Sequence, residues 1–299
     1  MQNIWAKLNF GAVVVLVLVV SGALARGVWG GPLDPPAAPG STMKTLEQVE
    51  PRTPISSLPY TISQSGSYYL TGDLTGVSGQ PGISVTASDV TIDLNGFTLI
   101  GVPGSTDGIS AAAGPNRIAV LNGRVRNWGA HGVNLQHAHD GRYERLQTSD
   151  NVWVGIYAGS GSIISESTSH HNGWGIYVTS EASTMDGGIV RNCVVSYNTS
   201  DGIVVADGVL VKDNVSKANA FAGIHVVGTR NRIEGNNVTD HYWYDDFWGI
   251  YIGTGIKVDG AYNFIANNSA AWNTSKILSP SRPRLSGYTA LSSRYPSRR

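Results

Sequence analysis

A pattern that opens with Gly and an apolar residue recurs along most of this chain of 299 residues. Three copies follow one another almost without interruption between Gly155 and Ala222. Extending the pattern in both directions gives eight opening glycines: Gly82, Gly108, Gly132, Gly155, Gly175, Gly202, Gly223 and Gly249. Successive openings are 20 to 27 residues apart. Such a period predicts a solenoid in which each repeat forms one coil of the chain.

The residues of each repeat favour strands over helices. They are mainly Ile, Val, Thr, Ser, Asn and Gly, which suit short strands and tight turns, whereas a leucine-rich repeat would need a dense Leu pattern. After the opening Gly, apolar residues alternate with outward ones, as in IYA at 156–158 and IYV at 176–178. This period of two predicts strands with one face in a core and the other face exposed.

A second register, rich in Asn, lies later in each repeat. One position carries Asn95, Asn122, Leu146, Ser167, Cys193, Asn214, Asn237 and Asn268, and the position five residues later carries Ile100, Asn127, Asn151, Asn172, Asn198, Asn219, Tyr242 and Asn273. Coils stacked about 4.8 Å apart would let equivalent Asn amides hydrogen-bond as a ladder. Asn also tolerates the left-handed backbone of a sharp corner. The alternative is that some of the Asn-x-Ser/Thr triplets are glycosylated.

These repeats resemble those of the right-handed parallel β-helix proteins of the pectate-lyase-like superfamily, and most closely the short Asn- and Gly-rich repeats of its periplasmic relatives. The resemblance covers residues 60–273. It implies an all-β fold, a single-stranded right-handed parallel β-helix of about eight to nine coils. It implies no single activity, because enzymes, binding proteins and adhesins share such repeats. The Gly-His-Gly, Arg-Ile-Lys and Asp-Pro-His motifs of its enzymes are absent, and Lys257 and Arg191 are only isolated bases.

The segments outside the repeats differ from them in composition. Residues 1–25 combine Lys7, an apolar run over 11–20 and small residues at 23–25, which is typical of a cleaved export signal and predicts a periplasmic or extracellular protein. An uncleaved anchor is the alternative, but the run is short for a span of about 20 residues. Residues 26–57 are predicted to be a Pro- and Gly-rich linker and N-terminal cap, 58–273 the β-helix, and 274–299 a disordered tail rich in Ser, Arg and Pro.

Composition limits the classes of partner and chemistry. The formal net charge is zero and charged residues make up 14%, so no basic surface for nucleic acid is predicted. The single cysteine, Cys193, has no internal disulfide partner and occupies a position of the Asn-rich register, so we expect a buried thiol. The sequence HAHD at 137–140 and the pair at 170–171 are expected to form corners rather than metal sites, since the repeats place no third ligand beside them.

Residues 240–251 hold the densest group of acids and aromatic residues. Asp245 and Asp246 are adjacent carboxylates of the kind that divide into a proton donor and a charged partner. They are therefore candidates for a general acid and base. They also offer oxygen ligands to a calcium ion, although no recognisable calcium loop is present. The Trp and Tyr side chains here suit the apolar faces of sugar rings. The alternative is a packed aromatic loop with solvated acids.

The outward position of each repeat predicts a row of side chains along one sheet. Stacking places Tyr157, Tyr177, His225 and Tyr251 in this row, with Trp174, Asp201 and Trp248 beside it. The catalytic candidates are Asp245, Asp246, Asp201 and His225, and the substrate-binding candidates are Tyr157, Trp174, Tyr177, Trp248 and Tyr251. Such an aromatic groove would suit a polymer lying along the coil axis. Alternatively, these residues merely cover an exposed sheet.

Three functions follow from these features. The leading hypothesis is an exported β-helix protein that binds a polysaccharide along the aromatic face, with no cofactor specified by the sequence and Ca²⁺ as the candidate. The second is a polysaccharide lyase or glycoside hydrolase whose site lies near residues 240–251. The third is a structural or adhesive shaft that forms oligomers through its linker or tail. Neither a nucleic acid nor, after signal cleavage, a membrane is an expected partner.

Overall fold

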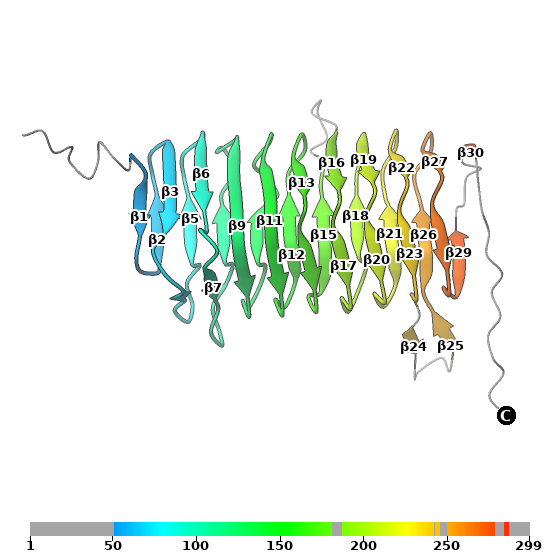
Figure 1. The fold of residues 1–299 in the computed structure, drawn as a ribbon, viewed down its shortest axis with the longest axis horizontal. Helices are drawn as coiled ribbons and strands as arrows, with labels where there is room; N and C mark the ends of the chain where they lie inside the picture. The colour runs from blue at the N-terminus through cyan, green and yellow to red at the C-terminus, as the bar shows by residue number, and fades with distance from the viewer. Residues whose placement is uncertain (1–50, 181–186, 242, 246–249, 279–283, 287–299) are drawn as a thin grey trace, which may run out of the picture. The chain divides into compact units, whose positions relative to one another are not determined.

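The computed structural model describes residues 51–180, 187–241, 243–245, 250–278 and 284–286. All regular elements among these residues are β-strands, and Figure 1 shows them as successive coils from β1 (Thr53–Ile55) to β29 (Ser275–Leu278). Strands of neighbouring coils pair in parallel, so the predicted all-β parallel solenoid is confirmed. In the part of the chain that the structure describes, no helix is long and apolar enough to cross a membrane. The predicted export signal and most of the predicted linker lie outside the described residues.

Each coil contributes one strand to a sheet of ten, which we call the front sheet. It contains β2 (Tyr60–Ile62), β5 (Ile83–Val85), β8 (Ile109–Ala111), β10 (Val133–Leu135), β12 (Val154–Ala158), β15 (Trp174–Val178), β18 (Ile203–Val205), β21 (Ala222–Val226), β26 (Thr254–Val258) and β29. Equivalent residues stand beside one another, because Tyr157 of β12 pairs with Tyr177 of β15. Outward side chains of the front sheet therefore form rows along the stack.

The remaining strands of the coils form a sheet of 18, which has two rows of strands. One row contains β1, β3 (Gly66–Leu70), β6 (Val90–Asp93), β13 (Ile163–Ser165), β16 (Gly188–Arg191), β19 (Val209–Lys212), β22 (Arg232–Glu234), β27 (Phe264–Ala266) and β30 (Arg284–Ser286). The other contains β4 (Leu74–Thr75), β7 (Thr98–Ile100), β14 (Thr168–His170), β17 (Val194–Ser196), β20 (Val215–Lys217), β23 (Asn237–Thr239) and β28 (Ser269–Ala271). The long strands β9 (Ile118–Arg126) and β11 (Arg142–Ser149) belong to both rows, because β11 pairs with β13 and with β14.

The core is built from the inward positions of these strands. Ile156, Ile176, Ile203, Ile224 and Ile256 stand in one row, one from each of five coils, and each has 0% exposure. Burying such a side chain contributes about 1.5–3 kcal/mol relative to leaving it in water. The alternation read from the sequence is thus the alternation between this core row and the outward row.

The opening glycine is needed because consecutive coils approach closely there. A Cβ on Gly202 would lie 2.6 Å from the carbonyl oxygen of Gly223, the opening glycine of the next coil. The same contact would be 2.5 Å between Gly108 and Gly132. Real Cβ atoms essentially never come this close to backbone, so any larger residue would push two coils apart. Coil stacking therefore explains the repeated Gly, because these positions do not have a left-handed φ angle that would itself require glycine.

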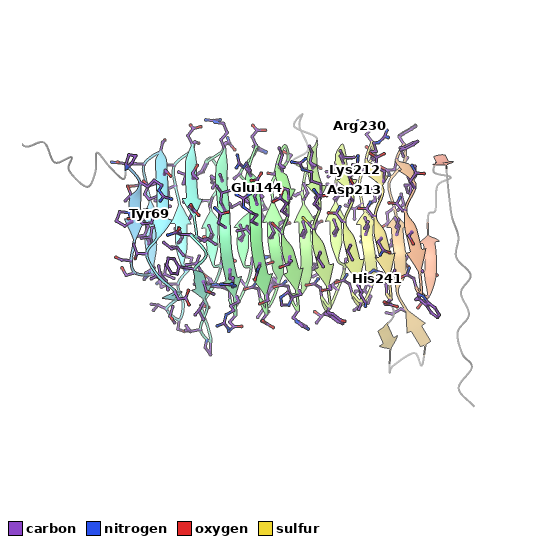
Figure 2. The ribbon with its side chains drawn as sticks, in the orientation of Figure 1. Tyr69, Glu144, Lys212, Asp213, Arg230 and His241 are labelled. Carbon is purple, nitrogen blue, oxygen red and sulfur yellow. The ribbon has the colours of Figure 1, made fainter. Side chains whose placement is uncertain are left out.

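Buried Asn side chains hydrogen-bond from coil to coil. The longest column, which we call the Asn column, comprises Asn151, Asn172, Asn198, Asn219, His241 and Asn273, all buried. Asn172 Oδ1 accepts from the backbone N–H of Asn151 at 3.1 Å and from its Nδ2 at 2.9 Å. Asn172 Nδ2 in turn donates to the carbonyl of Thr148. These bonds satisfy backbone groups at a corner where the ladder of strand hydrogen bonds is interrupted. His241 replaces an amide in the column and lies inside the stack of coils (Figure 2).

Asn122, Asn127 and Asn237, which were predicted for this Asn-rich register, lie one position away from it; Gly123, and not Asn122, pairs with Leu146. Asn127 is exposed, and the buried Trp128 takes the column position, where its N–H donates to Asn151 Oδ1 at 3.1 Å. Asn237 is exposed and Asn236 is buried, while Tyr242 lies outside the described residues and His241 fills its place. A residue with a left-handed backbone precedes the column position in these coils: Asn127 with φ 63° before Trp128, and Asp240 with φ 62° before His241. Cys193 is buried as expected, and burial raises the pKa of its thiol to about 11.

The last predicted repeat begins in the wrong place. Gly255, and not Gly249, is equivalent to Gly223, because Ala222 pairs with Thr254 and Ile224 with Ile256. The residues between form an excursion whose strands β24 (Trp243–Asp245) and β25 (Ile250–Ile252) pair antiparallel, outside the stack of coils (Figure 1). The stack also extends past both predicted boundaries at 58 and 273, since β1 pairs with β3 and β29 with β26.

Candidate functional site

The front sheet carries a row of outward polar and aromatic side chains. From β8 to β26 the row runs Ser110, Asn134, Tyr157, Tyr177, Val204, His225 and Lys257. The prediction that Tyr251 follows His225 in this row is wrong, because β25 belongs to the excursion and Lys257 pairs with His225. The backbone of Asp245 lies in β24, and Asp246 and Trp248 lie outside the described residues.

Tyr157 and Tyr177 form the aromatic centre of the row. Their rings stack with centroids 4.9 Å apart and planes 28° from parallel, as neighbouring coils bring them together. Both are half-buried. Burial raises the pKa of both hydroxyls, and the Asp201 carboxylate adds to the rise at Tyr177. The two phenols therefore stay neutral at physiological pH and present a continuous flat surface with polar edges.

Two tryptophans lie at the start of the strands that carry the tyrosines. The predicted Trp174 begins β15, pairs with Val154 and is half-buried. Trp153, which the sequence did not single out, is 53% exposed and contacts the edge of the His131 ring, with centroids 5.8 Å apart. Trp153 lies in a turn before β12, outside the Gly-Ile pattern, so the repeats gave no prediction for it.

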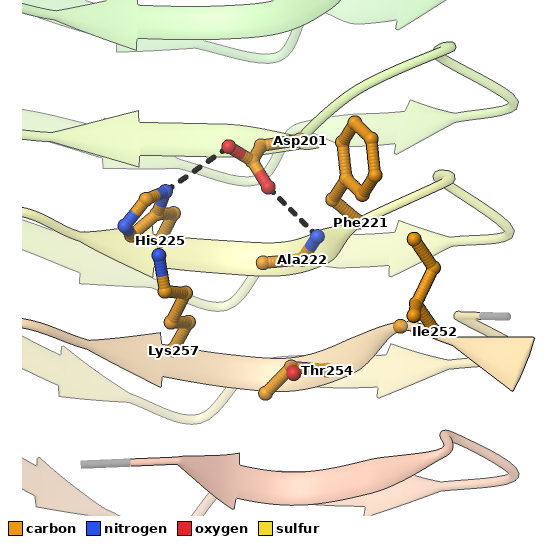
Figure 3. A pocket seen from close by; sticks show the side chains of 8 residues that line it. Asp201, Phe221, Ala222, His225, Ile252, Thr254 and Lys257 are labelled. Atoms are coloured by element: carbon orange, nitrogen blue, oxygen red, sulfur yellow. Dashed lines mark hydrogen bonds and ion pairs between the residues drawn. The ribbon is translucent and has the colours of Figure 1, made fainter. Parts of the chain in front are cut away.

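A cavity of about 330 Å³ opens on the same sheet, over β18, β21 and β26. Its lining includes Asp201, Phe221, His225, Ile252 and Lys257 (Figure 3). Three of these residues come from consecutive coils, so the cavity is built by the stacking itself. Ile252 and the adjacent Gly253 are where the chain returns from the excursion to the coil. Of the predicted catalytic residues, the structure brings Asp201 and His225 together here.

His225 is held between two carboxylates. Its Nδ1 lies 3.0 Å from Asp201 Oδ2, and its Nε2 lies 2.8 Å from Asp259 Oδ2. Asp201 Oδ1 accepts from the N–H of Ala222 at 2.7 Å, which fixes that carboxylate. Lys257 Nζ lies 3.1 Å from Asp259 Oδ2. We call Asp201, His225, Lys257 and Asp259 the charged cluster. The sequence did not predict Asp259 as a site residue, because its position beside His225 depends on the last coil starting at Gly255 and not at Gly249.

The charged cluster favours a protonated histidine. Burial alone would lower the pKa of His225, but its hydrogen bonds to Asp201 and Asp259 outweigh burial and raise it above the ordinary value. Burial also acts to raise the pKa of Asp259, yet His225 and Lys257 together hold it below the usual range. With His225 protonated, two cations face two anions and the cluster is neutral. Both ring nitrogens are then donors, so His225 ties the two carboxylates together and has no free atom to act as a base.

The other histidines support no metal site among the described residues, where no group of three or more His, Cys, Asp or Glu could hold a metal ion. His170 and His171 lie with their Nδ1 atoms 3.0 Å apart, and His171 stacks on Tyr197 at a corner away from the front sheet. His139 Nδ1 contacts Ser160 Oγ at 2.8 Å. The predicted calcium ligands remain a prediction, because neither carboxylate side chain, of Asp245 or Asp246, is described.

The fold and this site define a parallel β-solenoid that displays an aromatic row and a charged cavity on one sheet. The family described as the right handed beta helix region matches residues 75–240, more than half of the chain. The chain therefore belongs to the right-handed β-helix family, which also confirms the predicted handedness. No curated protein matches the sequence.

Solved structures are similar in fold at low sequence identity. ORF18 of Geobacillus virus E2 superposes with a TM-score of 0.52 at 15% identity, over 76% of this chain and 52% of that one. The chain thus spans about half the length of the viral protein. The A-module of the mannuronan C-5 epimerase AlgE4 from Azotobacter vinelandii superposes with a TM-score of 0.50 at 12% identity, over 80% of this chain and 90% of the module. At these identities the likeness establishes the fold alone.

Proposed function

We propose that the front sheet binds a polysaccharide, which lies along the stack from Tyr157 and Tyr177 to the cavity at His225 and Lys257. The observation that supports this most is the stacked tyrosine pair on the two coils that precede the coil of Asp201, the first of the residues that line the cavity. Sugar rings have apolar faces that pack on aromatic rings and hydroxyl edges that hydrogen-bond. Because outward side chains of consecutive coils stand about 4.8 Å apart, the row offers a continuous series of contacts along which an extended polymer can lie.

The charged cluster would anchor the polymer at one end. Lys257 is the more exposed of the two cationic residues that line the cavity, and its side chain remains 35% exposed beside Asp259. It can therefore bind a sugar oxygen or an acidic group without leaving its ion pair. The name of the similar A. vinelandii module, a mannuronan epimerase, makes mannuronan a sensible member of any ligand panel. Binding and not catalysis is the leading proposal, because both nitrogens of His225 already bond to carboxylates.

A lyase, epimerase or hydrolase is the second candidate function. It is favoured by the convergence of Asp201, His225 and Lys257 in one cavity, with the Tyr177 phenol near enough to Asp201 for that carboxylate to raise its pKa, since catalytic sites of this kind gather acids, bases and cations in one pocket. For catalysis, binding of the substrate would have to displace Asp201 or Asp259 from His225. In the hydrolase version Asp245 and Asp246 are the proposed acid and base. A structural shaft that forms oligomers is the third candidate.

A panel experiment separates these functions. The protein is incubated with mannuronan, pectate, xylan and cellulose, and bound protein, new reducing ends and ultraviolet absorbance from unsaturated ends are measured. The proposal predicts retention on at least one polymer without cleavage, and weaker retention for Lys257→Met. The control Lys212→Met removes a cation of similar exposure from the 18-stranded sheet and should change nothing. Cleavage that is lost in His225→Gln would establish the enzyme. Absence of both binding and cleavage would contradict both candidates and leave the shaft.

Export is part of the proposal and rests on residues 1–25. A cleaved signal predicts that the mature protein begins near residue 26 and is recovered outside the cytoplasm. N-terminal sequencing of the protein from fractionated cells tests this. Recovery of the uncleaved chain in the membrane fraction would support an anchor instead.

A further inference from the structure

We propose that His131, Trp153 and Tyr157 form a second subsite on the front sheet, which binds an uncharged sugar ring. This inference rests on the proposed polysaccharide function and goes beyond it by assigning a chemical class to one part of the ligand. The second subsite lies over β10 and β12, on the opposite side of the tyrosine pair from the charged cluster.

The three rings form a fixed and partly open surface. His131 contacts Trp153 edge-on, with centroids 5.8 Å apart and planes at 63°, and it contacts Tyr157 at 5.5 Å and 52°. Tyr157 is held in turn by its stack on Tyr177. Although these contacts order it, Trp153 is 53% exposed. A large apolar ring that is held in place and left open offers a stacking face at little cost in conformational entropy.

His131 provides a hydrogen-bond donor of known position. Its Nδ1 lies 3.2 Å from the backbone N–H of Val154 and accepts from it, so the neutral ring carries its proton on Nε2. Burial lowers the pKa of His131, although the Asp107 carboxylate acts in the opposite direction. The imidazole is therefore neutral at physiological pH, and its Nε2–H can donate to a sugar hydroxyl or ring oxygen.

The charge around this subsite disfavours an acidic sugar. Asp107 lies beside it, and its carboxylate accepts from the backbone N–H of His131 and from Nδ2 of Asn134, each at 3.0 Å. Within the described ranges, no Lys or Arg forms an ion pair with Asp107. A sugar carboxylate here would meet a like charge without a cation, whereas at the cavity it would meet Lys257. The two ends of the site thus select different units, and a polymer that contains both neutral and acidic sugars satisfies both.

The test titrates ¹⁵N-labelled protein with cellohexaose and mannohexaose as neutral probes and with hexamannuronate as the acidic one. The signals followed are the indole N–H of Trp153, assigned by its loss in Trp153→Phe, and the imidazole nitrogens of His131. We expect a neutral hexasaccharide to shift both signals, and the Nε2–H tautomer of His131 to be observed. In Trp153→Ala the dissociation constant should rise about five- to tenfold.

The control is Trp272→Asn. Trp272 is similarly exposed, at 58%, but lies at a corner next to Asn273, and its φ of 56° suits Asn. Its replacement should leave the affinity unchanged. If polymers bind but neutral probes leave Trp153 and His131 unshifted, or Trp153→Ala keeps full affinity, the second subsite is refuted while the polysaccharide function stands. Shifts caused by hexamannuronate alone would refute the uncharged class. No binding by any polymer would refute both proposals.

Discussion

Replacing Asn236 should destabilise the protein strongly, while replacing its neighbour Asn237 should not. Asn236 is 1% exposed, and its Oδ1 accepts from the N–H of Asn214 at 2.9 Å and from Asn214 Nδ2 at 3.0 Å. Its Nδ2 donates to the carbonyl of Val211 and to Asn268 Oδ1, both at 2.9 Å. Asn237 points outward from β23 and is exposed.

The size of the effect follows from the groups left without partners. In Asn236→Ala the N–H of Asn214, the carbonyl of Val211 and one amide oxygen each lose a buried partner. At about 1–3 kcal/mol for an unsatisfied buried group, and less for carbonyls, the loss should total about 3–5 kcal/mol. The total free energy of unfolding of a typical domain is only about 5–15 kcal/mol. The exposed change, Asn237→Ala, should stay within about 0.5 kcal/mol.

Urea unfolding followed by far-ultraviolet circular dichroism measures the difference. Because a solenoid need not unfold in one step, hydrogen exchange of the backbone amides in β19 and β22 should accompany it and show local opening in Asn236→Ala. Equal effects of the two substitutions, or a larger one for Asn237→Ala, would refute the assigned register and the structural role of the buried amides.

Three further predictions concern protonation and coil stacking. The folded pKa of His225 is raised, so the stability that its protonated form adds is complete below the unfolded pKa of about 6.5 and is lost as the pH rises through the folded pKa. In urea unfolding at a series of pH values, His225→Gln should no longer show this decrease in stability. Burial lowers the folded pKa of His241, so stability should fall as the pH drops below about 6.5, and His241→Asn, which restores an amide to the Asn column, should be less acid-sensitive in thermal unfolding. Gly202→Ala should cost about 2 kcal/mol or more, whereas Gly72→Ala, which meets nothing within 4 Å, should be nearly neutral by the same assay.

Most of the fold could be predicted because its determinants are local and repeated. Each Gly-Ile opening specifies a close approach followed by an inward side chain, and seven of the eight predicted openings are equivalent in the structure. The eighth predicted opening, Gly249, was wrong because GIYI at 249–252 and GIKV at 255–258 match the pattern equally well. Only pairing with β21 distinguishes them, and that contact is not local in the sequence.

The same error limited the prediction of the site. Asp201 and His225 were found, because they occupy repeat positions in coils whose register was right. Asp259 was missed and Tyr251 was misplaced, because both depend on where the last coil begins. Phe221 and Trp153 lie in turns of varying length between the Asn column and the next Gly, where stacking alone does not align residues.

The most direct test of the proposed function compares two tyrosines on different faces. Tyr177 lies in the row of the front sheet, whereas Tyr197 is 52% exposed at a corner, stacked on His171. Isothermal titration calorimetry with the polymer retained in the panel should show at least a tenfold loss of affinity, about 1.4 kcal/mol, for Tyr177→Ala and no change for Tyr197→Asn. Equal affinity of both variants and the unmodified protein would contradict binding along the front sheet.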